Sequence, residues 1–189
     1  MPTGYKSIFW EGEGILQSDR GASDLLGLPV TDANNVPLGA VREMLVDFDR
    51  ERLGALLIVD KISGEAGLVP AEDIVFGPET LTVAPDAIIR GDGAVILRQG
   101  KLKLEEACKL SVVTNSGSRL GNVADLIIDG IQLVALELSD GLLQDVFEGR
   151  NVLPLPENTR FEEEKLIVPD GVGLKIPDSP GEWQFNRGF

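Results

Sequence analysis

Carboxylates are the one group of side chains abundant enough in this sequence to suggest chemistry. The 189 residues include 31 Asp and Glu against 17 Lys and Arg, which gives a formal net charge of −14. Asp47 with Asp49, and Asp32 with Asn34, offer the oxygen ligands that calcium prefers. The stretch from Asp32, however, has Pro37 at the position where an EF-hand loop requires glycine. We therefore expect neither a metal site nor a cofactor.

The composition also removes most catalytic mechanisms. The chain has no histidine, which excludes Ser-His-Asp and Cys-His nucleophile pairs and histidine-ligated metals. Its single cysteine, Cys108, cannot build a cysteine-rich zinc or cluster site. A glycosidase-type pair of carboxylates stays an alternative, although a small β unit leaves little room for a deep cleft. The sequence predicts a protein that is not an enzyme.

Charge and hydropathy restrict the partners and the compartment. The basic residues are scattered, and only Arg50 with Arg52 and Lys101 with Lys103 lie close together, so direct binding of nucleic acid is disfavoured. The negative charge instead favours a basic protein partner and opposes anionic lipid. Charge-free runs stay far below the roughly 20 apolar residues of a membrane span. With no signal peptide and one cysteine, we expect a cytoplasmic protein without a transmembrane segment.

The elements that position these side chains form an internal repeat. The segment Leu28 to Asp47 aligns without a gap on Leu110 to Asp129, so that Gly39 corresponds to Gly121 at an offset of 82. Later matches drift to offsets of 80 and 84, as in the similarity of residues 68–70 to residues 152–154. Insertions in turns would cause such drift. The chain therefore carries the same unit, of about 60 residues, twice.

Each unit has the pattern of short β-strands. In the first unit, apolar segments rich in Val, Ile and Leu alternate with turn-forming clusters; these segments are 29–31, 39–47, 52–60, 67–74 and 80–83. Five or six strands at this spacing are typical of a small barrel or sandwich. No window sustains a helical period, and Pro70 opens a single helical turn at most. We predict an all-β fold with minor helical turns, arranged as two tandem small β-barrels.

The repeat divides the chain into five parts. They are an N-terminal extension with a hairpin over 5–16 (1–24), the first copy (25–90), a linker (91–106), a divergent second copy (107–170) and a C-terminal tail (171–189). We expect Ala94 to Arg98 to add a strand within the linker. The tail aromatics, Trp183, Phe185 and Phe189, either pack on a barrel or belong to a free end. Because each copy has a limited core, we expect the copies to pack on each other or the chain to form a homodimer.

The order of these motifs resembles the PRC-barrel domain, a family named after the cytoplasmic barrel of the photosynthetic reaction-centre H subunit. The match covers Leu26 to Val83, and a weaker match covers Leu110 to Val168. The second copy departs from the pattern, because Ser111 replaces the proline of Pro29. The resemblance implies that each copy is a PRC-type barrel that acts in assembly or docking, as in the reaction centre or in a ribosome maturation factor.

The positions shared by the two copies have structural explanations. Gly39 and Gly121 lie between a polar turn and a strand, where a positive φ or a bulge is expected. Asp47 and Asp129 precede turns, and we expect their side chains to cap backbone amides there. Pro70 and its counterpart Pro154 mark the points where a strand leaves the sheet, because proline cannot donate to a ladder.

Two functional hypotheses follow. In the first, which the resemblance favours, the chain is a non-catalytic interaction or assembly module that docks on a protein or on a membrane-protein complex. In the second, it is a ribosome-associated or RNA-processing factor that acts through a basic ribosomal protein, since its acidic charge opposes direct contact with RNA.

Overall fold

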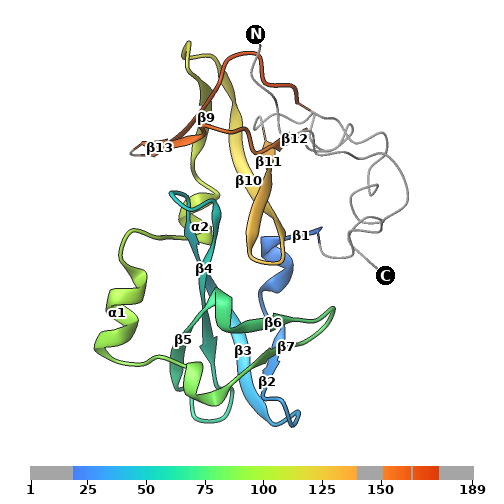
Figure 1. Cartoon of the computed structure of the whole chain (residues 1–189), viewed down its shortest axis with the longest axis vertical. Helices are drawn as coiled ribbons and strands as arrows, with labels where there is room; N and C mark the ends of the chain where they lie inside the picture. Colours follow the sequence, from blue (N-terminus) through green and yellow to red (C-terminus); the bar gives the residue numbers. More distant parts are fainter. Residues whose placement is uncertain (1–18, 140–150, 163, 175–189) are drawn as a thin grey trace.

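The computed structural model describes residues 19–139, 151–162 and 164–174. Over these ranges the chain is mostly β-strand with short helical turns, and all the strands connect into one sheet network (Figure 1). The predicted all-β fold with two tandem copies is confirmed. The hairpin expected over 5–16 and the tail aromatics lie outside the described residues.

The first eleven elements lie between residues 19 and 98. They are β1 (Asp19–Gly21), η1 (Ala22–Leu25), β2 (Pro29–Thr31), β3 (Pro37–Asp47), β4 (Arg52–Val59), β5 (Ala66–Pro70), η2 (Ala71–Asp73), β6 (Ile74–Phe76), β7 (Leu81–Val83), η3 (Pro85–Ala87) and α1 (Asp92–Arg98). The remaining elements are β8 (Leu102–Lys103), α2 (Leu104–Ala107), β9 (Ser111–Thr114), β10 (Arg119–Asp129), β11 (Gln132–Ser139), β12 (Asn151–Pro154), β13 (Arg160–Glu162) and β14 (Lys165–Val168).

The two copies are related by an internal twofold arrangement of their strands. The sheet order β13-β14-β9-β10-β11-β4-β3-β2-β7-β6 is symmetric about the junction of β11 with β4, and β2 to β7 correspond one by one to β9 to β14. Even the irregularities repeat. The register of β3 shifts between Val41 and Glu43, and that of β10 shifts between Val123 and Asp125, 82 residues later. The repeat therefore preserves backbone geometry as well as apolar pattern.

The copies exchange their leading strands. Strand β1 pairs antiparallel with β10 of the second copy, with Gly21 opposite Ile127. Strand β8 pairs antiparallel with β3 of the first copy, with Lys103 opposite Leu45. The two pairs are equivalent, because Lys103 lies 82 residues after Gly21 and Ile127 lies 82 residues after Leu45. Each copy thus completes the sheet of the other, and Figure 1 shows β1 and α2 near the waist between the two halves.

The short helices that follow the exchanged strands are also equivalent. The Asp24 carboxylate accepts a hydrogen bond from the Gly21 amide at 3.2 Å, and the Glu106 carboxylate accepts one from the Lys103 amide at 2.9 Å. Each acid occupies the third helical position, where it satisfies an amide that the helix leaves unpaired. The structural repeat therefore begins upstream of Leu28, although Leu28 is the first residue of the match that is visible in the sequence.

One continuous hydrophobic core joins the two copies. It includes Leu25 and Leu56 from the first copy and Leu126 and Leu136 from the second, all at most 1% exposed. The hairpin tips also bond to each other, since the Leu53 amide donates to the Ile131 carbonyl at 2.8 Å and the Leu133 amide donates to the Glu51 carbonyl at 2.9 Å. The two copies pack on each other, which is one of the two arrangements expected from their limited cores.

The linker differs from what the sequence predicts. Two expectations were wrong here, that Ala94 to Arg98 adds a strand and that no window sustains a helical period, because this stretch forms helix α1. The linker's strand is β8, a few residues later. Asp92 in the first turn and Arg98 in the last both complement the helix dipole. The β-branched pair Val95 and Ile96, which favoured a strand, remains exposed on the helix.

Candidate interaction surface

Gly39 and Gly121 allow two strands to approach closely. They have φ angles of 145° and 148°, which side chains disfavour. A Cβ at Gly39 would lie 2.5 Å from the Val59 carbonyl oxygen, and one at Gly121 would lie 3.0 Å from that of Ser139. Each glycine is the third residue of a long strand and does not lie in the turn before it. They set the curvature of β3 and β10 against β4 and β11.

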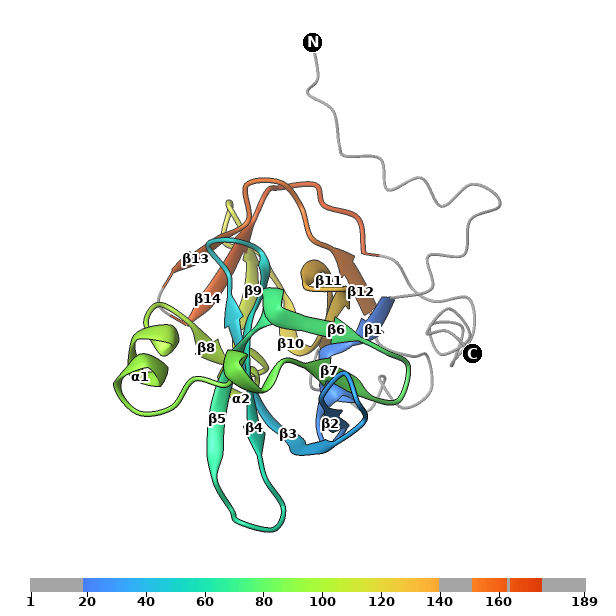
Figure 2. The ribbon, with the colours of Figure 1, turned by 60° about the horizontal axis from the view of Figure 1, so that its bottom comes forward.

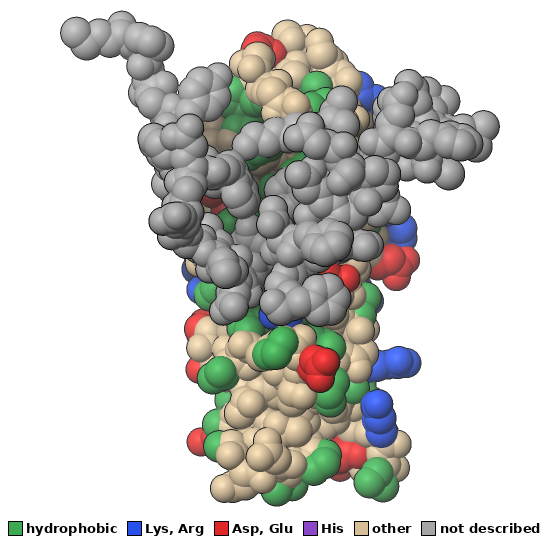
Figure 3. All heavy atoms as spheres, turned by 90° about the vertical axis from the view of Figure 1, so that its right-hand side faces the viewer, with side chains coloured by type: hydrophobic (Ala, Val, Ile, Leu, Met, Phe, Trp, Pro, Cys, Tyr) green, Lys and Arg blue, Asp and Glu red, His purple; other side chains and the backbone are tan. Residues whose placement is uncertain are grey.

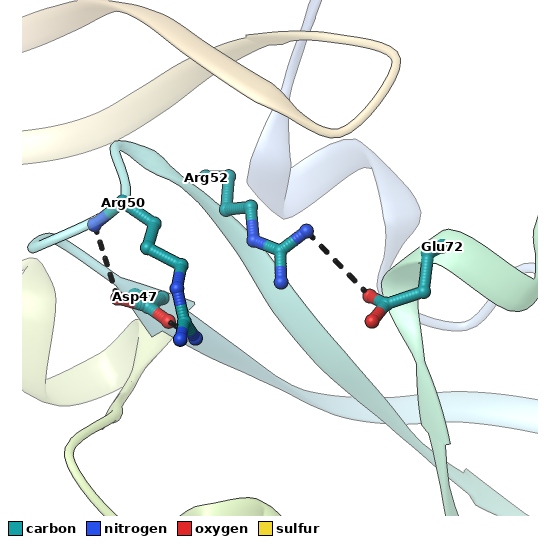
Figure 4. Close-up of polar contacts among 4 residues, drawn as sticks. All are labelled: Asp47, Arg50, Arg52 and Glu72. Carbon is teal, nitrogen blue, oxygen red and sulfur yellow. Dashed lines mark hydrogen bonds and ion pairs between the residues drawn. The ribbon is translucent and has the colours of Figure 1, made fainter.

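Asp47 closes the turn between β3 and β4 (Figure 4). Its carboxylate accepts hydrogen bonds from the backbone amide and from Nη1 of Arg50, both at 3.1 Å. The turn therefore engages both carboxylate oxygens of Asp47. In the second copy the corresponding turn is two residues shorter, with Asp129 directly opposite Gln132.

Pro70 and Pro154 are the last residues of β5 and β12. Pro70 lies opposite Ala55 and then opens η2, while Pro154 lies opposite Ala135. Each strand ends here because proline has no amide hydrogen to donate further along the ladder. The structure places the six positions singled out in the sequence within strands or at their ends, and it does not gather them into one site.

A polar contact that the sequence did not reveal holds the exchanged segment of the first copy. Asp125 of β10 is 5% exposed, and its carboxylate accepts hydrogen bonds from the Ser23 amide, from the Ser23 hydroxyl and from the Leu126 amide. The equivalent positions in the other half are Glu105 and Glu43, two acids. Glu105 binds Lys109 instead, at 2.7 Å. The contact with Ser23 is therefore specific to one half of the molecule.

Arg52 lies at the junction of the two hairpin tips, opposite Gln132 of the second copy. Its Nη1 lies 3.8 Å from a carboxylate oxygen of Glu72 in η2 (Figure 4), and the Glu72 side chain is 53% exposed. Such a long, partly exposed ion pair contributes little to stability. We assign Arg52 a packing role between the copies and no chemical one.

The perturbed titratable groups in the described part of the chain belong to surface turns and one surface ion pair. The backbone amides of Ser63 and Ile62 lower the pKa of Asp60, and the Lys109 ammonium lowers the pKa of Glu105. The Ser116 amide lowers the pKa of Asp170 in the same way as in Asp60. Within residues 19–139, 151–162 and 164–174, no group of three or more Asp, Glu or Cys residues is placed to hold a metal ion. Among those residues, no helix is long and apolar enough to cross a membrane.

The geometry described so far is that of a known domain, present twice. The family model for the PRC-barrel domain matches residues 19–89 and residues 100–175. The chain belongs to the PRC-barrel family. Both matches begin upstream of the repeat visible in the sequence, so each PRC-barrel unit includes its exchanged strand, β1 or β8. None of the curated proteins compared with the chain matches it. PRC-barrel domains occur in protein interaction and assembly.

Helix α1 presents the most concentrated apolar feature on the described surface. Ala94 and Leu97, three residues apart, pack against Leu45, Ala55 and Leu68 on the outer face of the first copy's sheet. The neighbouring side chains Val95 and Ile96 point elsewhere and are 62% and 66% exposed. Figure 2 shows α1 standing to one side of β5. The helix is thus fixed to the fold by one face and apolar on another.

Basic side chains follow this apolar pair along the chain. Residues 90–103 contain four Lys and Arg and one Asp, a net charge of +3 in a chain whose total is −14. A Cβ at Gly54 would lie 2.6 Å from Cδ and Cε of Lys101, so the stem of this lysine lies along β4. We define the α1–β8 surface as Val95, Ile96, Arg98, Lys101 and Lys103.

The side of the lower half seen in Figure 3 shows no comparable feature among the described residues. In Figure 3, hydrophobic side chains of the lower half are scattered singly among backbone and polar atoms. Single exposed apolar side chains, such as Val36 at 52% and Val75 at 68%, are normal on a protein surface. The α1–β8 surface was not predicted from the sequence, because residues 94–98 fit a strand as well as a helix, although the local excess of basic residues is visible there.

Proposed function

We propose that the protein is a non-catalytic interaction or assembly module that docks on a protein or membrane-protein complex through its α1–β8 surface. The observation that carries the proposal is the exposed pair Val95 and Ile96, held on a helix whose other face is packed. The interlocked copies supply the platform, because exchange of β1 and β8 prevents the two halves from moving independently. The family's role in assembly supports the same proposal.

The charge of the α1–β8 surface specifies the partner. Its three basic side chains complement an acidic protein segment that offers apolar side chains to Val95 and Ile96. An anionic membrane would also attract basic residues, but the chain's total charge of −14 opposes approach to such a surface. A short acidic segment of a protein meets less of this repulsion than an extended anionic membrane does, because charges separated by more than about 8 Å are largely screened at physiological ionic strength. The single cysteine agrees with a cytoplasmic location for this contact.

A charge-and-bulk variant tests the proposal. V95E/I96E places two carboxylates on the α1–β8 surface, and burying an aliphatic side chain stabilises a contact by about 1.5–3 kcal/mol. Because about 1.4 kcal/mol is tenfold in affinity, the double variant should reduce the partner crosslinked in native cells by more than about tenfold. The matched control is I62E, since Ile62 is 99% exposed at the tip between β4 and β5.

The readout is crosslinking with mass spectrometry, in which Lys101 and Lys103 should link to acidic peptides of one partner. Thermal melting of both variants shows whether the fold is intact. Equal recovery of the partner by V95E/I96E and I62E would remove the α1–β8 surface from the interaction, and crosslinks to a second copy of the chain would identify a homodimer instead.

The total charge supports a second candidate, a ribosome-associated or RNA-processing factor that binds a basic ribosomal protein. The two candidates require partners of opposite charge. Capture from source lysate with and without nuclease separates them, because partners held through a ribosomal particle are lost after nuclease treatment. Such a loss, with V95E/I96E without effect, favours the ribosomal candidate.

A further inference from the structure

The outer faces of the two copies carry equivalent apolar clusters. One consists of Leu45, Ala55 and Leu68, and the other of Ile127, Ala135 and Val152, related by offsets of 82, 80 and 84. All six are buried, at 5% exposure or less. Both clusters are separate from the core that joins the copies. Each face therefore needs a cover of its own.

The cover is known for the first copy. Ala94 and Leu97 of α1 pack on Leu45, Ala55 and Leu68. On the second copy, Val134 is the one apolar neighbour that the described residues supply to the cluster. An apolar face of this kind, left open, would be an exposed hydrophobic patch. The described residues therefore do not account for the burial of this face, which α1 provides on the first copy.

The internal symmetry indicates which segment would cover this face. Leu81 of β7 corresponds to Leu166 of β14, and Ala87 corresponds to Val172, both at an offset of 85. Ala87 and Val172 both pack against the shared core, so the correspondence holds close to the last described residue. Continued at the same offset, α1 maps onto residues 177–183.

We propose that the C-terminal segment 175–189 covers the face formed by Ile127, Ala135 and Val152, in the place that α1 takes on the first copy. Trp183, Phe185 and Phe189 give this segment the large apolar side chains that such a cover requires. The inference is independent of the proposed docking role, because it concerns the opposite copy and a contact within the chain.

A tryptophan reporter tests the proposal in the full-length chain. The sequence has two tryptophans, Trp10 and Trp183, so W10F leaves Trp183 as the only one. Packing on the second copy should make acrylamide quenching of Trp183 several-fold weaker in the native protein than in urea. Quenching as efficient as in urea would overturn the proposal.

Truncation supplies the second measurement. A chain ending at Leu174 should bind the dye 1-anilinonaphthalene-8-sulfonate as strongly as the calibrating variant L97E, which uncovers the first copy's face. Deletion of residues 1–18 is the matched control and should leave dye binding unchanged. If the deletion of residues 1–18 increases dye binding instead, segment 175–189 is not the cover. The same conclusion follows if light scattering detects a dimer and the protection of Trp183 disappears when that dimer dissociates on dilution. If the truncated chain does not fold, the quenching of Trp183 decides.

Discussion

The contact between Ser23 and Asp125 provides a direct test of the exchange between the copies. These residues are 102 positions apart, and the Asp125 carboxylate receives the Ser23 hydroxyl as well as the Ser23 and Leu126 amides. A hydrogen bond to a charged group contributes about 1.5–3 kcal/mol. S23A removes one such bond, whereas D125A leaves two backbone amides and a hydroxyl without their acceptor. The D125A cost should therefore exceed that of S23A.

A double-mutant cycle in urea isolates the contact. We expect S23A, D125A and the double variant to give a coupling energy of about 1.5–3 kcal/mol in the free energy of unfolding. The matched control is the cycle of E105A with E43A, the symmetry-equivalent positions. Glu105 is engaged by Lys109, so its coupling to Glu43 should stay below about 0.5 kcal/mol. Coupling that is absent in the first cycle, or equal in both, would refute the reasoning.

Three further predictions concern the strand geometry, the interlock and the acid response. G39A should lower the free energy of unfolding by about 2–5 kcal/mol, because the added Cβ strains the backbone and contacts the Val59 carbonyl. G64A is the control: its Cβ would lie in open space, so it should lower the free energy of unfolding by only about 1–2 kcal/mol. Urea titration of both variants measures the difference. Fragments divided between α1 and β8 should each lack cooperative melting alone and regain it on mixing, and two independently stable halves would contradict the exchange. The Ser116 amide lowers the pKa of Asp170, so this carboxylate stabilises the fold at pH values above its unfolded pKa of 3.8. The stabilisation is lost as the pH falls through the lower pKa of the folded protein. D170N should remove that part of the acid sensitivity in unfolding titrations.

The sequence located the two copies because the backbone constrains particular residues. Gly39 and Gly121 are retained at the same offset because their φ angles and the closeness of the neighbouring strand exclude a side chain. The exchange was not predictable. Asp24 and Glu106 perform the same capping, yet the segments around them share chemistry and not residue identity. A strand of two or three residues also carries too little pattern to indicate its partner.

The candidate surface was partly visible in the sequence. The excess of basic residues after Arg90 can be counted, but the exposure of Val95 and Ile96 depends on α1 being a helix. Four consecutive apolar residues fit a buried strand as well as a helix. Packing on the outer face of the first copy favours the helix, because Ala94 and Leu97, three residues apart, then both contact that face.

The exchange of leading strands also determines when the protein can fold during synthesis. Ser23 leaves the ribosome 102 residues before its partner Asp125. At about 5–20 residues per second, the first copy's leading strand waits roughly 5–20 s for the strand that pairs with it. Until β8 emerges, the edge of β3 with which it pairs stays open to other chains. Completion of each sheet is therefore tied to synthesis of part of the other copy, and a chain stalled between the copies presents an unpaired sheet edge to the cell.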